Sequence, residues 1–463
     1  MSKTKKSIKI LLVEPDYRNK YPPLGLMKIA AFHKQKGHDV RFVKGCDSEI
    51  RNLGWDEIYI TTLFSFYWNK TIETIKYYLR TPGNPKIYIG GIMASLMQDD
   101  IEEATGIRPV FGLLNEKGKL GIDDEEIIDR LVPDYHILED ISYIYPAHDA
   151  YFAHTTRGCI RKCEFCAVSI IEPKYVDYIP LKSQIELIDK KFGQKKDLLL
   201  MDNNVLASKQ FDRIVDEIKD AGFVKGAKLG KRLRYVDFNQ GIDPRILTKE
   251  KIERLAELPI KPLRIAFDDI ELKEIYAEKI RWAAEYGLVY LSNYVLYNFE
   301  DTPEDFYERL RINIELNEEL GTQIFSFPMK YVPFTSKNRK YIGSNWNYRY
   351  LRSVNCILNA THGVVGIKKP FFNRAFGENV EQFKRLLAMP EKYIIYRDQH
   401  EATEAKAWVV QYDGLLADQK IVLHGIIDKQ KFVDDITGNE RLDEVLQHYR
   451  RDTESLQQVV LQV

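Results

Sequence analysis

About a third of the way along the 463-residue sequence stands Thr155-Thr156-Arg157-Gly158-Cys159-Ile160-Arg161-Lys162-Cys163-Glu164-Phe165-Cys166. Three of the five cysteines of the chain fall within this stretch, spaced Cys-x3-Cys-x2-Cys. Thiolates this close together indicate a metal centre rather than disulfides. A loop with this spacing can wrap a cubane cluster and ligate three of its four irons through Cys159, Cys163 and Cys166. The fourth iron then has no protein ligand and can bind a small molecule.

A zinc site is the competing interpretation of the same residues. His154 lies five residues before Cys159, so one histidine and three cysteines could supply the four ligands of a Cys3His zinc site. Structural zinc usually takes its ligands in two separated pairs, and the sequence contains no second pair of this kind. The spacing therefore favours the cubane over a single ion.

Composition places the chain among soluble globular proteins of two to four domains, with 44% hydrophobic and 29% charged residues. Lys+Arg and Asp+Glu both number 68, so net charge gives no support for nonspecific binding to nucleic acid or membranes. The apolar run 8–13 is short and interrupted by Lys9, which predicts a strand rather than a secretory signal. No stretch approaches a membrane span, and few cysteines fit a reducing compartment, so we expect a cytoplasmic protein.

With Phe165 directly before its last cysteine, the loop resembles that of the radical S-adenosylmethionine (SAM) superfamily. The resemblance implies a [4Fe-4S] cluster on Cys159, Cys163 and Cys166, whose open iron chelates the amino and carboxylate groups of SAM. It further implies that an electron, from a reductant such as flavodoxin or ferredoxin, cleaves SAM. The product would be a 5′-deoxyadenosyl radical that abstracts a hydrogen atom from the substrate.

Residues 1–140 alternate strands and helices, which predicts a Rossmann-like, doubly wound parallel sheet. The expected strands are 8–13, 39–43, 57–61 and 86–89, and the expected helices are 24–36 and 69–79. Residues 22–26, 30–31 and 36–40 resemble the cobalamin-binding-type domain that precedes many radical SAM domains. The Asp-x-His-x-x-Gly signature is absent, because the first loop is Asp16-Tyr17-Arg18-Asn19-Lys20. Two alternatives stay open: cobalamin held without a protein histidine, or a cofactor-free scaffold.

After a connection at 134–148, a second alternation matches the partial (βα)6 TIM-type barrel that the resemblance implies for residues 150–335. Its expected strands are 151–156, 197–201, 234–238, 263–267, 288–295 and 323–327, and its expected helices are 183–191, 209–221, 249–255, 272–286 and 304–320. Barrels of this kind carry their chemistry at the C-terminal strand ends. The cysteine loop directly follows the first of these strands.

A charged methionine moiety and a ribose need polar partners, so the strand ends are the expected SAM site. The residues that the resemblance assigns to cofactor binding are Phe165, Asp202, Asn203, Gln240, Asp268, Ser292, Asn293, Pro328 and Met329. Phe165 and the segment around Pro328 would flank the adenine, and Asp268 would contact ribose or substrate. For Asp202 and Asn203, turn formation and helix capping are equally good explanations. No catalytic residue is assigned.

The resemblance does not extend to residues 336–463. Their sequence pattern predicts a mostly helical α+β extension, which would be an accessory or substrate domain. Basic and aromatic residues are mixed over 337–376, and two explanations are open. The aromatic rings could stack on bases while the cations contact phosphates, or the residues could build a small core against which the aliphatic parts of Arg and Lys pack. Cys356 is either a relay thiol or a small buried residue. A strand pair is expected at 408–412 and 420–426, and an amphipathic helix at 439–463.

The resulting interpretation is a cytoplasmic radical SAM enzyme of class α/β. The reaction would be methylation if cobalamin binds, and rearrangement or oxidation if it does not. The alternative from another class is a nucleic-acid-binding protein whose metal-bound cysteine loop is structural.

Overall fold

The computed structural model describes residues 7–121, 125–429 and 437–450. The chain forms two compact units. The first unit consists of Met1–Arg264, Tyr286–Leu288 and Val332–Tyr341, and the second of Ile265–Glu285, Val289–Tyr331 and Ile342–Val463. Helices and parallel strands occur in both, so the predicted α/β class is confirmed. The three predicted domain ranges stay a prediction.

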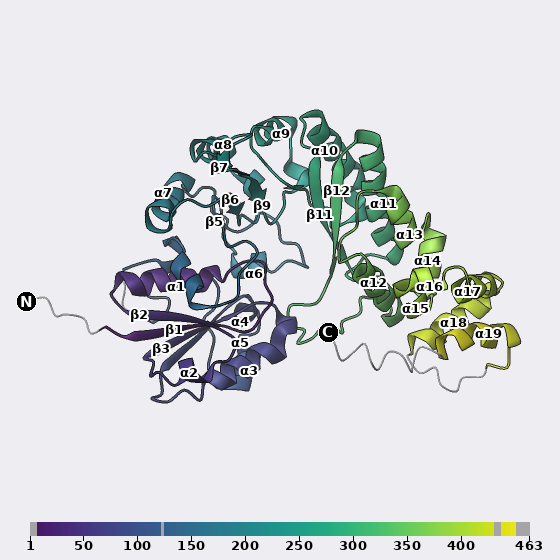
Figure 1. The fold of residues 1–463 in the computed structure, drawn as a ribbon, viewed down its shortest axis with the longest axis horizontal. Helices are drawn as coiled ribbons and strands as arrows, with labels where there is room; N and C mark the ends of the chain where they lie inside the picture. The colour runs from purple at the N-terminus through teal and green to yellow at the C-terminus, as the bar shows by residue number, and fades with distance from the viewer. Residues whose placement is uncertain (1–6, 122–124, 430–436, 451–463) are drawn as a thin grey trace, which may run out of the picture. The chain divides into compact units, whose positions relative to one another are not determined.

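The N-terminal part is a four-stranded parallel sheet of order β2-β1-β3-β4. Its strands are β1 (Lys9–Glu14), β2 (Asp39–Lys44), β3 (Glu57–Thr62) and β4 (Lys86–Gly91). Helix α1 (Leu24–Gln35) covers one face, and α3 (Trp68–Tyr78) covers the other (Figure 1). Because both faces are covered, every side chain from Ile10 to Val13 is fully buried. The predicted doubly wound sheet is confirmed.

Helix α1 carries a fully buried histidine next to this sheet. The Nε2 atom of His33 lies 3.0 Å from the hydroxyl of Tyr59, and its Nδ1 lies 2.9 Å from Nδ1 of His38. Burial, reinforced by the charges of His38 and Lys36, lowers the pKa of His33 to about 3. An unfolded histidine takes up a proton near pH 6.5, so the native state loses stability as the pH falls from there towards 3.

We therefore expect replacement of His33 by glutamine to flatten the pH dependence of stability. Between pH 7 and pH 5 the wild-type chain should lose about 2 kcal/mol more of its free energy of unfolding than His33→Gln, because the unfolded histidine alone binds the proton. Urea unfolding followed by circular dichroism at both pH values measures this difference. Equal losses in the two proteins would contradict the assignment.

The second alternation of strands and helices also matches the prediction in chain order. The first unit contains the parallel sheet β5 (Ala150–Ala153), β6 (Asp197–Leu200) and β9 (Val236–Phe238), followed by β10 (Leu263–Arg264). The second unit contains the parallel pair β11 (Tyr290–Tyr297) and β12 (Gln323–Lys330). The helices between them are α7 (Leu181–Phe192), α8 (Phe211–Asp220), α9 (Lys249–Ala256), α10 (Lys273–Glu285) and α11 (Pro303–Leu320). A two-residue hairpin, β7 (Lys228–Leu229) with β8 (Arg232–Leu233), was not expected.

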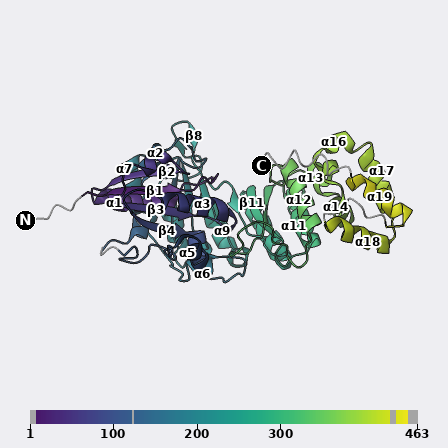
Figure 2. The ribbon, with the colours of Figure 1, turned by 90° about the horizontal axis from the view of Figure 1, so that it is seen from below.

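The C-terminal extension is helical throughout its described part (Figure 1 and Figure 2). Its helices are α12 (Tyr348–Ala360), α13 (Lys369–Phe376), α14 (Val380–Ala388), α15 (Glu391–Ile395), α16 (Arg397–His400), α17 (Glu404–Asp413), α18 (Ala417–Asp428) and α19 (Glu440–Arg450). The predicted strand pair at 408–412 and 420–426 is wrong, because both segments belong to helices. Of the expected helix at 439–463, residues 451–463 lie outside the described residues.

Some of the basic and aromatic residues of 337–376 build this helical core, and the others are exposed or half-buried. Trp346, Phe372 and Phe376 are buried in it. Arg349 is buried and donates to the carbonyl of Met389, and its neighbour Arg352 pairs with Glu391 at 2.9 Å. These contacts support the core explanation over nucleic-acid stacking.

Cys356 lies in the same core with its Sγ 3.7 Å from a carboxylate oxygen of Glu391. Burial, with the negative charge of Glu391, raises the pKa of the thiol to about 12, so it stays protonated. Between these two explanations the structure favours the small buried residue over the relay thiol.

None of the helices in the described ranges combines the length and the apolar character needed to cross a bilayer.

Candidate functional site: the cysteine loop and the cavity beside it

The cysteine loop leaves the end of β5 through a tight turn at Gly158. Arg157 and Val176 exchange backbone hydrogen bonds of 3.2 and 2.9 Å, which anchors the start of the loop to the segment that follows it. Gly158 has φ +70°, and a Cβ there would lie 2.5 Å from the carbonyl oxygen of Lys174. Only glycine fits this turn, and its N–H donates to Glu172 at 2.8 Å.

Asp202, at the end of β6, ties the end of β5 to its own strand. Its Oδ1 accepts hydrogen bonds from the backbone N–H and the hydroxyl of both Thr155 and Thr156. Burial raises the pKa of Asp202 against the effect of these four donors. Its Oδ2 is buried and finds no hydrogen-bond donor among the described residues. This carboxylate therefore fixes the point from which the cysteine loop departs, and one of its oxygens still lacks a partner.

Two hydrogen-bond donors lie next to the thiol of Cys159, and one cation lies next to that of Cys163. The Sγ atom of Cys159 lies 3.3 Å from the backbone nitrogen of Arg161 and 3.5 Å from the side-chain nitrogen of Asn204. The guanidinium of Arg245 interacts with the thiol of Cys163. All three cysteines of the loop are partly exposed. Such surroundings stabilise the negative charge of thiolates that ligate a metal centre.

His154 does not join the cysteines. Its Nε2 lies 2.9 Å from Nη1 of Arg157, which donates to it. Burial, together with the positive charge of Arg157, lowers its pKa well below the usual value. Throughout 7–121, 125–429 and 437–450, no three His, Cys, Asp or Glu side chains are grouped to hold one metal ion, so the structure brings neither His154 nor the three loop cysteines together as a ready-made ligand set. The contact between His154 and Arg157 argues against the Cys3His zinc alternative.

A network of polar side chains connects α1 to the cysteine loop, and its four charged members are each less than one-fifth exposed. Lys28 of α1 donates to Asp129 at 2.9 Å, and Arg157 donates to the same carboxylate oxygen. Arg157 also donates to Glu172 at 3.1 Å, which in turn accepts from Asn203 at 3.2 Å. Burial alone would raise the pKa of Asp129, but Lys28 and Arg157 outweigh it and lower the pKa. The network holds the start of the loop at a fixed position against α1.

The same network forms one wall of a cavity of about 340 Å³. This volume is within the range of about 300–1,000 Å³ typical of small-molecule sites. The other walls are the C-terminal ends of β3 and β4, the start of α1 and the segment 110–120. Ligands of doubly wound sheets bind at this edge, and a Cβ added at Gly25 or Gly90 would meet nothing within 4 Å. The walls are mostly apolar, with the charged groups gathered at the end next to the cysteine loop.

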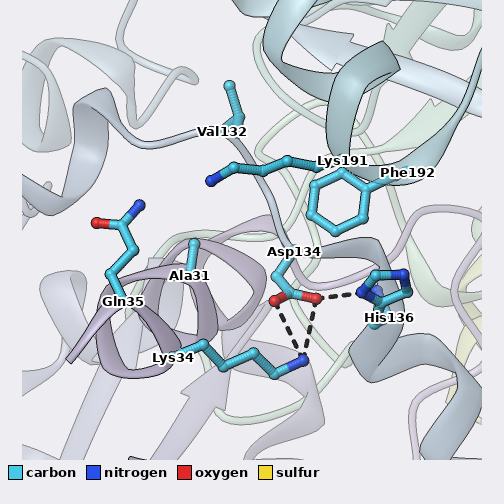
Figure 3. Close-up of a pocket in the computed structure, with 8 residues that line it drawn as sticks. All are labelled: Ala31, Lys34, Gln35, Val132, Asp134, His136, Lys191 and Phe192. Carbon is cyan, nitrogen blue, oxygen red and sulfur yellow. Dashed lines mark hydrogen bonds and ion pairs between the residues drawn. The ribbon is translucent and has the colours of Figure 1, made fainter. Parts of the chain in front are cut away.

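A second cavity, of about 310 Å³, has a structural explanation (Figure 3). Lys34 points at Asp134 and pairs with it at 3.1 Å. The carboxylate also accepts from the backbone N–H of His136 at 2.9 Å, which caps the short 3-10 helix Tyr135–Asp140. These contacts attach the connecting segment to α1, so we assign no chemistry to this cavity.

Two further predicted residues of the first unit differ in exposure. Phe165 is half-buried in the cysteine loop, whereas Gln240 is exposed. Its neighbour Asn239 is buried instead and accepts a hydrogen bond from the hydroxyl of Tyr21. The roles of Phe165 and Gln240 in cofactor binding stay predictions.

The remaining five predicted residues belong to the second unit. Ser292 and Asn293 are both buried on β11 and point to opposite faces of it. The side-chain nitrogen of Asn293 donates to Tyr276 of α10 at 2.9 Å, and Tyr276 donates to Asn313 of α11 at 2.8 Å. Asn293 therefore faces the helices that cover the strand. Met329 is 48% exposed, and Pro328 before it is half-buried.

Asp268 lies next to a buried arginine that sequence reasoning missed. Arg309 of α11 is fully buried and donates to the carbonyl of Asp268 at 2.8 Å and to that of Leu296 at 2.7 Å. It also pairs with Asp301 at 2.9 Å. The arginine thus joins the end of β11 to the segment that carries Asp268. Asn204, Arg245 and Arg309 had no distinguishing signal in the sequence, apart from the Asp202-Asn203-Asn204 run after β6.

The fold of the chain is similar to that of a solved methyltransferase. No protein-family model matches the sequence. The chain is similar in structure to the radical S-adenosylmethionine methyltransferase TsrM from Kitasatospora setae with cobalamin and a [4Fe-4S] cluster bound, at TM-score 0.53, 14% identity, 76% of this chain and 78% of that one. The same enzyme with tryptophan substrate and a SAM analogue matches at TM-score 0.50 and 16% identity, over 72% and 75% of the two chains. These likenesses establish the fold, with its Rossmann-like and TIM-barrel-like parts.

In sequence, the chain is similar to an uncharacterized methyltransferase of Synechocystis sp. (strain ATCC 27184 / PCC 6803 / Kazusa). The two are 22% identical over 213 residues, which is 41% of this chain. The match covers 37% of the length of that protein, so it concerns a part of it.

Proposed function

We propose that the chain is a radical SAM enzyme, with Cys159, Cys163 and Cys166 as the thiolate ligands of a [4Fe-4S] cluster. The observation that carries this proposal is the Cys-x3-Cys-x2-Cys loop at the C-terminal end of β5, with two donors next to Cys159 and Arg245 next to Cys163. The likeness in fold to TsrM supports it. When bound, the cluster and SAM supply the electron and the 5′-deoxyadenosyl radical.

The residues around the loop have separate tasks in this proposal. Asp202 holds the strand ends together, and Arg245 offsets the charge of the thiolates. The Oδ1 of Asn204 and the Oδ2 of Asp202 are buried acceptors without a donor in the described part of the chain. An ammonium group such as that of SAM brings the donors that these oxygens need.

The cavity beside the loop is the proposed cobalamin site, and methylation is then the reaction. Its mostly apolar walls, its place at the sheet edge and its open space before Gly90 fit one side of a large flat cofactor. Lys28 and Asp129 are the polar groups that would bond its periphery. No histidine of the first loop is available for cobalt, and His154 accepts a hydrogen bond from Arg157 instead. Cobalamin supplies a methyl carrier when bound.

The same proposal implies an electron donor, a cellular location and a domain organisation. A reductant such as flavodoxin or ferredoxin would deliver the electron, in the cytoplasm. The three predicted domains would be a cobalamin-binding part at 1–140, a TIM-type barrel at 150–335, and an accessory part at 336–463 for the substrate.

The experiment that tests the function is anaerobic reconstitution with iron and sulfide. We expect a brown protein with about four irons per chain that releases 5′-deoxyadenosine from SAM on reduction, or transfers its methyl group when cobalamin is present. Retained or added corrinoid should be visible by absorption. A colourless protein that binds one zinc ion would contradict the proposal.

We expect the contact between Asn204 and Cys159 to tune the cluster. A hydrogen bond to a ligating sulfur stabilises the reduced, more negative state, so Asn204→Leu should make the reduction potential more negative. Redox titration followed by electron paramagnetic resonance, without SAM, measures the potential. The matched control is Asn203→Leu, because Asn203 bonds Glu172 rather than a cysteine. Equal shifts in the two variants would refute the assignment to this hydrogen bond.

A further inference from the structure

The C-terminal helices enclose a third cavity, of about 450 Å³. Three of its walls are the end of α12, one side of α13 and the segment from the end of α15 into α16 (Figure 1). Buried apolar side chains form its floor, among them Ile357, Ala375 and Ile394. Two exposed aromatic side chains, Phe371 at 45% and Tyr396 at 47%, stand at its rim. Part of the cavity is therefore apolar, and polar side chains such as Thr361 and Gln399 line the rest.

Two arginines line the same cavity, and they differ in their partners. Arg374 is already paired, because it donates to Asp398 and, at 3.1 Å, to Glu401. Arg397 is partly buried, and within the described residues no carboxylate lies in ion-pair distance of its guanidinium. Burial lowers the pKa of Arg397, and only the more distant charges of Glu401 and Asp398 oppose this. A partly desolvated guanidinium that faces a cavity gains from a bidentate anion more than an exposed one does.

We propose that this cavity binds a small carboxylate with an aromatic or aliphatic body, whose carboxylate pairs with Arg397. The body lies on Ile357, Ala375 and Ile394, between Phe371 and Tyr396. Asp398 and Glu401 are the partners of Arg374, so Arg397 is the guanidinium of this cavity left for a ligand within the described residues, which suits a single negative charge. A polyanion such as nucleic acid would meet these two carboxylates and would be repelled.

The test uses the full-length, anaerobically reconstituted protein and 2-naphthoate as the probe, followed by its fluorescence. We expect naphthoate to bind with a dissociation constant of about 1 mM or lower. 2-Naphthalenemethanol, which lacks the charge, should bind at least about tenfold more weakly. 2-Naphthyl phosphate should bind no more tightly than naphthoate. Absence of naphthoate binding, or equal binding of the alcohol, would overturn the proposal. Tighter binding of the phosphate would overturn the choice of a carboxylate.

Two variants locate the binding in this cavity. Arg397→Gln should weaken naphthoate binding at least about tenfold, since it removes a charge-assisted hydrogen bond. Its control is Arg281→Gln, because Arg281 is exposed on α10 and pairs with Glu319 outside the cavity. Phe371→Ala changes an exposed side chain with little risk to folding, and it should also weaken binding of the naphthyl body. Unchanged affinity in Arg397→Gln and Phe371→Ala would show that naphthoate binds elsewhere. Binding is measured without SAM, so this outcome leaves the proposed radical SAM activity untouched.

Discussion

Replacing Cys159, Cys163 or Cys166 by alanine, one at a time, is expected to abolish the cluster and to reduce SAM cleavage to background. Each cysteine supplies one of three thiolates, and a cluster that lacks one of them loses a ligated iron. The cysteines are partly exposed in a loop, so their loss creates no cavity in the core. Iron content, visible absorption and release of 5′-deoxyadenosine should therefore fall together, while the circular dichroism spectrum stays that of the wild type.

The matched control for these variants is Cys46→Ala. Cys46 is exposed and belongs to the N-terminal part, well away in sequence from the loop. This variant should keep wild-type iron content and activity. If an alanine variant of the loop retains four irons and cleaves SAM, the assignment of these three ligands is wrong. If all three variants lose one bound zinc ion instead of iron, the loop is structural.

The N-terminal sheet could be predicted because its signals are local. The run Ile10–Val13 is apolar at every position, as expected for a strand buried on both faces. Helix α1 begins after two prolines and ends at Gln35; Gly37, two residues later, has a φ of +74° that glycine adopts without strain. The ends of strands were less predictable. For example, β10 spans only Leu263–Arg264, whereas a strand of five residues, 263–267, was expected.

The wrong strand pair shows where local signals fail. Residues 408–426 contain many β-branched side chains, which favour strands. In the structure Trp408 stacks on Tyr412, four residues later, with ring centroids 4.8 Å apart. Ile421 is 74% exposed, while Leu423 and Ile427 are buried. This spacing of four is that of a helix face, and packing against the other helices outweighed the propensity.

The candidate site was predictable only where its residues are close in sequence. The three cysteines are predicted as metal ligands from their spacing alone. By contrast, the bond between Lys28 and Asp129 joins residues 101 positions apart, and no local pattern marks either of them. Asn293 was predicted as a cofactor contact because it is polar in an apolar strand; in the structure its amide nitrogen donates to Tyr276, and its role in cofactor binding stays a prediction. Which face of a strand a polar residue occupies depends on the register, and that follows from tertiary packing.

The second large effect is expected at Arg309, where substitution by methionine should destabilise the second unit by about 3–5 kcal/mol. The guanidinium is fully buried and bonds the carboxylate of Asp301 and the carbonyls of Phe267, Asp268 and Leu296. Methionine fills much of the volume but leaves Asp301 as a buried charge without its cation and the carbonyls without their donor. Thermal unfolding followed by circular dichroism measures the loss, and Arg281→Met, at an exposed ion pair, should cost less than about 1 kcal/mol.

A double substitution separates the buried charge from the lost hydrogen bonds. Burial raises the pKa of Asp301, and the charge of Arg309 is the main influence that lowers it. In Arg309→Met this carboxylate should therefore take up a proton at higher pH, so the variant should lose less stability at pH 5 than at pH 8. Adding Asp301→Asn removes the uncompensated charge and should recover part of the stability at pH 8, while the three carbonyls remain unsatisfied. If the double variant is no more stable than Arg309→Met at pH 8, the carbonyl contacts rather than the ion pair account for the stabilisation, and the arginine acts chiefly by joining the end of β11 to the segment of Asp268.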